Sequence, residues 1–185
     1  MTTYNIYISS DTLVKVTGLT DESTEEYVND ATITMALYRE LVLHPDMGST
    51  VEDSGDGKIQ VQINSHGLTT DDYVRLVGFQ DYNDESGAVL EVIDENTVKL
   101  NISYSNDEEC NGHESIYVAL RRSNGTWPIS LAYQAGTNGN YYGILPKDIL
   151  GLVHGNFYWL FVDIVKDSSR LVSRLDWRAV YHPGI

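Results

Sequence analysis

The histidines and the lone cysteine are the side chains best suited to metal or nucleophilic chemistry. The histidines are scattered along the chain, at His44, His66, His113, His154 and His182. None shows the H-x-x-x-H or H-E-x-x-H spacing by which one helix presents two zinc ligands, and Cys110 has no second cysteine to join it. We therefore expect neither a metal site nor a metal cofactor.

Carboxylates are abundant, and two loops concentrate them. Asp53 and Asp56 lie in one loop, and Asp81, Asp84 and Glu85 lie in another. Neither loop has the twelve-residue EF-hand pattern, so we interpret both as solvated charge rather than calcium sites. A glycosidase needs two carboxylates across a cleft, and a chain with 27 acidic residues cannot single out such a pair by sequence.

Patterns for covalent and nucleotide chemistry are absent from the sequence. The chain has no G-x-S-x-G elbow, no P-loop and no dinucleotide-binding fingerprint. Cys110 lies among acidic residues, which disfavour a reactive thiolate. We therefore expect no enzymatic activity, no catalytic residue and no cofactor.

Aromatic side chains carry the remaining functional signal. Tyr and Trp are enriched at the centres of protein interfaces. The candidate interface residues are Tyr141, Tyr142, Tyr158, Trp177 and Tyr181. Core packing is the alternative for each of them, because large aromatic rings dominate core burial.

The length and the net charge of the chain limit the classes of function that it can have. The chain has 185 residues, with 12 Lys and Arg against 27 Asp and Glu, which gives a net charge of −15. This balance argues against binding to nucleic acid or to an anionic membrane, since both need a basic face. We find no apolar stretch of spanning length and no secretory signal, so we expect synthesis in a reducing cytoplasm.

Side chains of alternating polarity predict the elements that position these residues. Ile33, Met35 and Leu37 alternate with polar neighbours, and the same period of two recurs at 58–63, 98–102 and 116–121. That period is typical of half-buried strands. Residues 157–162 are apolar on both faces, which predicts a central strand. Asp94 to Thr97 predicts a tight hairpin, and residues 146–151 could form one helical turn.

Acidic, polar stretches near residues 51 and 106 divide the sequence. We interpret residues 55–105 as a small inserted β-module, and residues 1–54 with 106–185 as one discontinuous β-sandwich. The predicted fold class is therefore all-β.

The stretch from His66 to Gly78, followed by 89–94 and 97–100, resembles a known pattern. It is similar to the "H-G-L…G-D-x-V…G…G…V…T-F-x-L" pattern of small β-modules in tailed-phage virion proteins, which is also likened to a half-domain of ubiquitin-activating enzymes. Asp71 stands where that family has Gly, and Val98 where it has Phe. The resemblance implies a barrel-like unit without chemistry of its own. Within it we interpret His66 as a turn residue that bonds the local backbone.

The flanking halves resemble immunoglobulin-like phage modules. Residues 29–37 are similar to their "x-D-A-x-V-x-A-x-L" strand, residues 139–146 to "G-x-Y-x-G-x-L-P", and residues 152–162 to "L-x-x-G-x-x-Y-x-L-x-V". The resemblance implies an immunoglobulin-like antiparallel β-sandwich that carries an inserted small β-barrel-like module. It further implies a structural protein of a bacteriophage virion, at the neck, tail or baseplate.

The expected partners are other virion proteins and copies of the chain itself, with no nucleic acid and no membrane. The expected location is the virion, after synthesis in the bacterial host cytoplasm. Two other functions stay open. One is a receptor- or carbohydrate-binding module of a phage fibre, and the other is a hydrolase of cell-wall or other polysaccharide.

Overall fold

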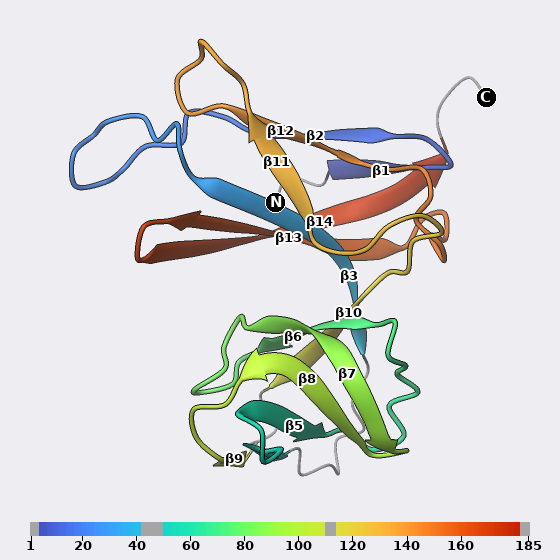
Figure 1. Ribbon diagram of the computed structural model, residues 1–185. Helices are drawn as coiled ribbons and strands as arrows, with labels where there is room; N and C mark the ends of the chain where they lie inside the picture. Colours follow the sequence, from blue (N-terminus) through green and yellow to red (C-terminus); the bar gives the residue numbers. More distant parts are fainter. Residues whose placement is uncertain (1–3, 42–49, 110–113, 182–185) are drawn as a thin grey trace. The chain divides into compact units, whose positions relative to one another are not determined.

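The computed structural model describes residues 4–41, 50–109 and 114–181 (Figure 1). These residues form 14 strands and no helix, so the all-β prediction is confirmed, and the arrangement is sandwich-like. The helical turn expected at 146–151 is therefore wrong, and that segment forms turns. Cys110, His44, His113 and His182 lie outside the described residues.

The chain divides into two compact units, residues 1–38 with 120–185, and residues 39–119. The first unit contains β1 (Tyr4–Ile8), β2 (Thr12–Val16), most of β3 (Thr32–Leu41), β11 (Ile129–Tyr133), β12 (Tyr141–Leu145), β13 (Phe157–Lys166) and β14 (Ser169–Tyr181). The second contains β4 (Thr50–Asp53), β5 (Lys58–Gln62), β6 (Tyr73–Val77), β7 (Ser86–Asp94), β8 (Thr97–Ser103), β9 (Glu108–Glu109) and β10 (Ser115–Ala119).

Two layers of strands enclose the core of the first unit. One layer has the order β1-β14-β13-β3, in which β1 runs parallel to β14. The other is β2-β12-β11, and β11 also pairs with β3. Ile33, Met35 and Leu37 of β3 point into this core, as their alternation predicts. β13 pairs with both β14 and β3, so the central strand expected at 157–162 is confirmed.

The second unit has its own core and the strand order β10-β6-β7-β8-β5-β4-β9. β7 ends at Asp94 and β8 begins at Thr97, which confirms the tight hairpin. Its bounds, 39–119, are wider than the 55–105 expected for the module. The extra strands belong to it because β4 pairs with β5 and β10 with β6, while Val51 and Val118 pack into the second core.

Candidate interaction surface

The alternation of β12 decides which of its aromatic residues face outward. Tyr141 and Leu145 are buried, whereas Tyr142 and Ile144 are exposed. Gly143 lies on the buried side, where a Cβ atom would come within 3.0 Å of Leu131 Cγ. The side chain of a neighbouring strand therefore fills the space that the glycine leaves.

The outward residues of β12 continue into apolar residues on both neighbouring strands. Ile144 is opposite Leu13 of β2, and Tyr142 is opposite Lys15 of β2 and Ala132 of β11. We call these five residues the outer face. Leu13 is 52% exposed, Ile144 50% and Tyr142 44%, so three large apolar side chains meet water together.

β2 is an edge strand of this layer. Within the part of the chain that the structure describes, β12 is its one strand partner. An edge strand presents unpaired backbone N–H and C=O groups, to which a further strand can bond. The outer face therefore combines an apolar surface with an adjacent sheet edge, and both can bind another protein.

The five candidate interface residues do not share one surface. Tyr141, Tyr158 and Trp177 are at most 5% exposed and belong to the first core, so they are not available to a partner. The Tyr141 hydroxyl accepts a hydrogen bond from Ala31 N at 2.9 Å. Tyr142 lies on the outer face, whereas Tyr181 lies at the end of β14 in the other layer.

Tyr181 is part of a separate aromatic group. It is 66% exposed, and its ring stacks on His154 with the centroids 4.9 Å apart. Phe157, 55% exposed, lies under the Arg178 guanidinium at 6.0 Å. The loop that holds His154 is attached to β14 by the hydrogen bond from Gly155 N to Ala179 O.

Sequence reasoning missed Leu13 and Ile144. The available signal was the period of two in residues 139–146, which places residues 142 and 144 on one side. It could not identify that side as the exposed one, because both sides carry apolar or aromatic residues. Leu13 follows only from the β2–β12 register, a pairing between residues more than 100 positions apart.

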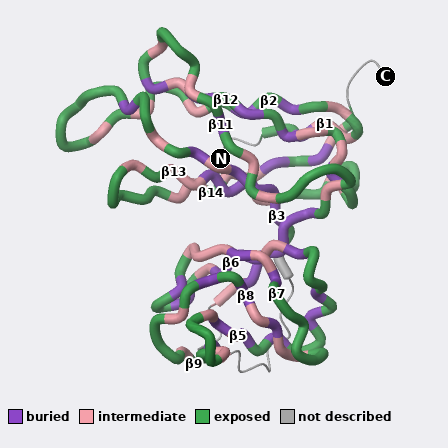
Figure 2. Tube along the Cα trace, viewed as in Figure 1, coloured by how far each residue is buried: buried purple, intermediate pink, exposed green. Residues whose placement is uncertain are grey.

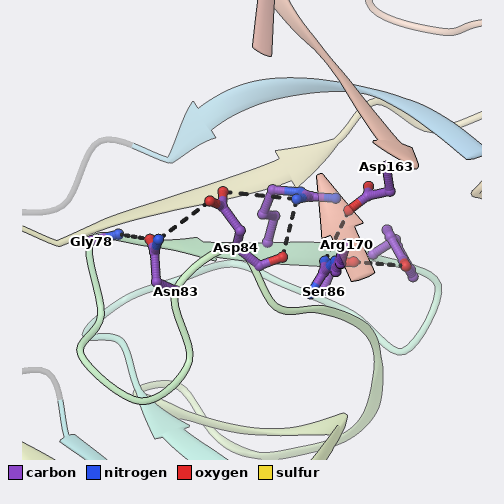
Figure 3. Close-up of polar contacts among 8 residues, drawn as sticks. Gly78, Asn83, Asp84, Ser86, Asp163 and Arg170 are labelled. Atoms are coloured by element: carbon purple, nitrogen blue, oxygen red, sulfur yellow. Dashed lines mark hydrogen bonds and ion pairs between the residues drawn. The ribbon is translucent and has the colours of Figure 1, made fainter. Parts of the chain in front are cut away.

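Polar side chains in the acidic loops of the second unit form hydrogen bonds with neighbouring residues of the same chain. Asp56 Oδ2 lies 2.6 Å from Lys99 Nζ, and this hydrogen bond, helped by Ser54, lowers the pKa of Asp56 to about 2. The Asn83 side chain accepts from Gly78 N and donates to Asp84, as Figure 3 shows. Across residues 4–41, 50–109 and 114–181, no three His, Cys, Asp or Glu side chains gather as a metal site.

His66 has the turn role expected of it. Its Nδ1 accepts a hydrogen bond from Leu68 N at 2.8 Å, and its Nε2 lies 3.1 Å from Asp94 O. The side chain is buried and fixes the turn beside the β7–β8 hairpin. It is a structural residue of the second unit.

No family model, curated protein or solved structure matches the chain. The described residues contain no helix of the length and apolarity that crossing a membrane requires.

Proposed function

We propose that the protein is a non-enzymatic structural component of a tailed-phage virion that acts by binding neighbouring proteins. Its partners are other virion proteins and copies of itself, and its place is the neck, tail or baseplate. The observation that carries the binding role is the outer face, where Leu13, Tyr142 and Ile144 are exposed together beside the edge of β2 that no described strand covers.

The size of the outer face favours a contact that is repeated or reinforced. Covering the exposed parts of its three large side chains, roughly 270 Å² in all, stabilises a complex by about 7 kcal/mol at ~25 cal/mol per Å². Association of two proteins costs about 4–15 kcal/mol in lost freedom of motion, so this gain alone leaves little surplus. The face therefore suits an assembly in which strand pairing at β2 or several copies act together.

The virion assignment draws its support from the sequence. The phage-module motifs at 29–37, 139–146 and 152–162 overlap β3, β12 and β13, three strands around one core. A net charge of −15 keeps free subunits apart until they meet a matching surface.

Purified particles from the host that carries this gene test the proposal. We expect mass spectrometry to find the chain in them at a fixed stoichiometry. Its absence from the particles contradicts the virion assignment.

A double variant tests the outer face in the same particles. Leu13→Ser with Ile144→Ser is expected to fold and to be lost from the particles. The matched control is Leu90→Ser with Ile93→Ser, which removes two residues 45% exposed on the second unit. Equal incorporation of both double variants contradicts a role for the outer face.

A second candidate, carbohydrate binding, is favoured by the exposed rings of Phe157 and Tyr181. Aromatic rings held in place by Arg178 and His154 are suited to stacking on a sugar. A glycan array with the wild type and Phe157→Ala/Tyr181→Ala tests it. Binding that the double variant loses supports this function, and an array without binding rejects it.

A further inference from the structure

A groove opens at one end of the first unit, between the loop after β2 and the tip of the β13–β14 hairpin. Its volume is about 540 Å³. Both segments are largely exposed in Figure 2. We call it the tip groove. Its lining includes Leu19, Val28, Ile164 and Leu171 as apolar residues, and Asp21, Glu22 and Asp167 as carboxylates.

Ile164 and Leu171 form the apolar floor of the tip groove. They lie on the core-facing side of the β13–β14 hairpin, at the part of the hairpin that extends beyond the core. Leu171 pairs with Ile164 across the hairpin. It lies on the same side of β14 as Leu175 and Trp177, which pack in the core. Leu171 is nevertheless 58% exposed, because the loop leaves it uncovered. A leucine on the core-facing side of a strand is an apolar anchor point that the chain itself does not fill.

The rim of the tip groove carries excess negative charge. Lys166 Nζ binds Asp30 with 2.5 Å to each carboxylate oxygen, and this contact lowers the pKa of Asp30 and raises that of Lys166. Lys166 Nζ also lies 3.9 Å from Asp167 Oδ2. Its single positive charge offsets one carboxylate, so Asp21, Glu22, Asp30 and Asp167 together keep three negative charges in excess.

The remaining cation at the groove also has a carboxylate partner. Arg170 donates to Asp163 at 2.9 Å, as Figure 3 shows. The two ion pairs cancel, so the tip groove keeps a charge of about −3, by simple counting of ionised groups at neutral pH.

Hydrogen bonds hold one of these carboxylates in place. Asp21 Oδ1 accepts from the Ser23 hydroxyl and from Ser23 N at 2.8 Å, which lowers the pKa of Asp21. The carboxylate is therefore ionised and oriented before any partner arrives.

We infer that the tip groove binds an extended peptide segment of a partner protein in which basic and apolar side chains alternate. The apolar side chains cover Leu171 and Ile164, and the basic ones reach Glu22 and Asp167. At this groove a second copy of the chain is disfavoured as the occupant, because the acidic rim would face a chain of net charge −15. This inference is separate from the outer face and from the virion assignment.

Three synthetic peptides test the inference on the full chain by ¹H–¹⁵N NMR titration. The probe is acetyl-Leu-Arg-Val-Arg-Leu-amide. One comparison peptide has Glu in place of Arg, and the other has Ala in place of Leu and Val. We expect the probe to shift amides in residues 19–28 and 164–171. We expect the affinity of each comparison peptide to be lower than that of the probe by a factor of about ten or more. No shifts at millimolar probe, or equal binding of the Glu peptide, overturns the inference.

A matched pair of charge variants separates the tip groove from general attraction to an acidic protein. Glu22→Lys with Asp167→Lys is expected to weaken probe binding about tenfold, since two exposed ion pairs are lost and the reversed charges repel the basic side chains. Asp71→Lys with Glu91→Lys makes the same change of net charge at exposed positions of the second unit and is expected to leave binding unchanged. Equal weakening by both double variants overturns the inference.

A third variant tests the apolar floor without altering charge. Leu171→Ser is expected to weaken binding of the probe and to leave that of the Ala peptide unchanged. Equal effects on the two peptides contradict an apolar contact at Leu171. The spectrum of each free variant shows that it is folded before titration.

Discussion

Single glycines fix the close approach of segments that are distant in the sequence. Gly139 has φ +61°, and a Cβ atom there would lie 2.3 Å from the carbonyl oxygen of Leu19. The backbone of Leu19 itself donates a hydrogen bond to Gly139 O at 3.0 Å. The glycine thereby lets the loop after β2 lie directly on the turn before β12.

We expect Gly139→Ala to destabilise the first unit by about 3 kcal/mol, from a positive φ and a backbone clash together. Gly136→Ala is the control, because Gly136 has φ +79° with no atom within 4 Å of a Cβ. It should cost about 1 kcal/mol. All three tryptophans, Trp127, Trp159 and Trp177, lie in the first unit, so their fluorescence during urea unfolding measures both values.

Equal losses in the two variants would contradict the clash at Leu19. They would leave the positive φ, which the two glycines share, as the sole cost.

The Asp56–Lys99 ion pair makes a pH-dependent contribution to the stability of the second unit. The pKa of Asp56 is about 2 in the folded chain, below its ordinary 3.8. A depressed pKa means that the contribution is complete above pH 3.8 and is lost as the pH falls through about 2. Carbon-detected NMR of the Asp56 carboxyl group measures this titration directly.

Lys99→Met is the informative variant for this pair. It removes the hydrogen bond of the ammonium group, and we expect the Asp56 midpoint to rise toward 3.8. A midpoint that stays near 2 would assign the shift to Ser54 alone.

At the level of elements, strands followed from the sequence where polarity alternates. Ile59 and Val61, and Val98 and Leu100, are buried on adjacent strands as their spacing predicts. The aromatic residues of β12 were harder to assign, because alternation predicts two faces and does not identify the buried one. That choice depends on Leu131, which belongs to another strand and packs against Gly143.

Tyr141 connects β12 to the segment that leads into β3. Its hydroxyl accepts from Ala31 N and donates to Val28 O at 3.2 Å, and the residue is buried. Tyr141→Phe leaves both backbone groups without this partner. We expect a loss of about 1–2 kcal/mol and faster hydrogen exchange at the Ala31 amide.

Tyr133→Phe is the matched control for this effect. Tyr133 donates to the carbonyl of Thr137, in a turn where water can replace the hydroxyl. Its loss should be smaller and should leave the Ala31 amide unchanged. If the two variants behave alike, Tyr141 does not anchor the loop.

For the whole molecule, composition predicted an acidic all-β protein but not the limits of its units. The acidic stretches near 51 and 106 lie inside the second unit rather than at its borders. Strand pairing decides the borders, since β4 joins β5 and β10 joins β6. Pairings between distant segments leave no local trace in a single sequence. The tip groove could not be predicted from the sequence for the same reason, because its two sides are about 140 residues apart in the chain.

Two separate cores predict that each unit can open without the other. Leu100→Ala makes a cavity in the second core and Leu160→Ala makes one in the first. Each should cost about 2–5 kcal/mol. Hydrogen exchange should then accelerate in residues 50–109 for Leu100→Ala, and in 129–181 for Leu160→Ala. Acceleration of both regions by either variant would show that the units unfold together.

The parallel pairing of β1 with β14 has a mechanical consequence. The register runs from Tyr4 beside Trp177 to Ile8 beside Tyr181, so the two strands point the same way along their whole contact. Tension that pulls Tyr4 backward and Tyr181 forward slides one strand along the other. All the backbone hydrogen bonds between them then bear the load at the same time. The β1–β14 pair therefore resists the tension in shear, whereas a pair pulled apart from one end would lose its hydrogen bonds one after another.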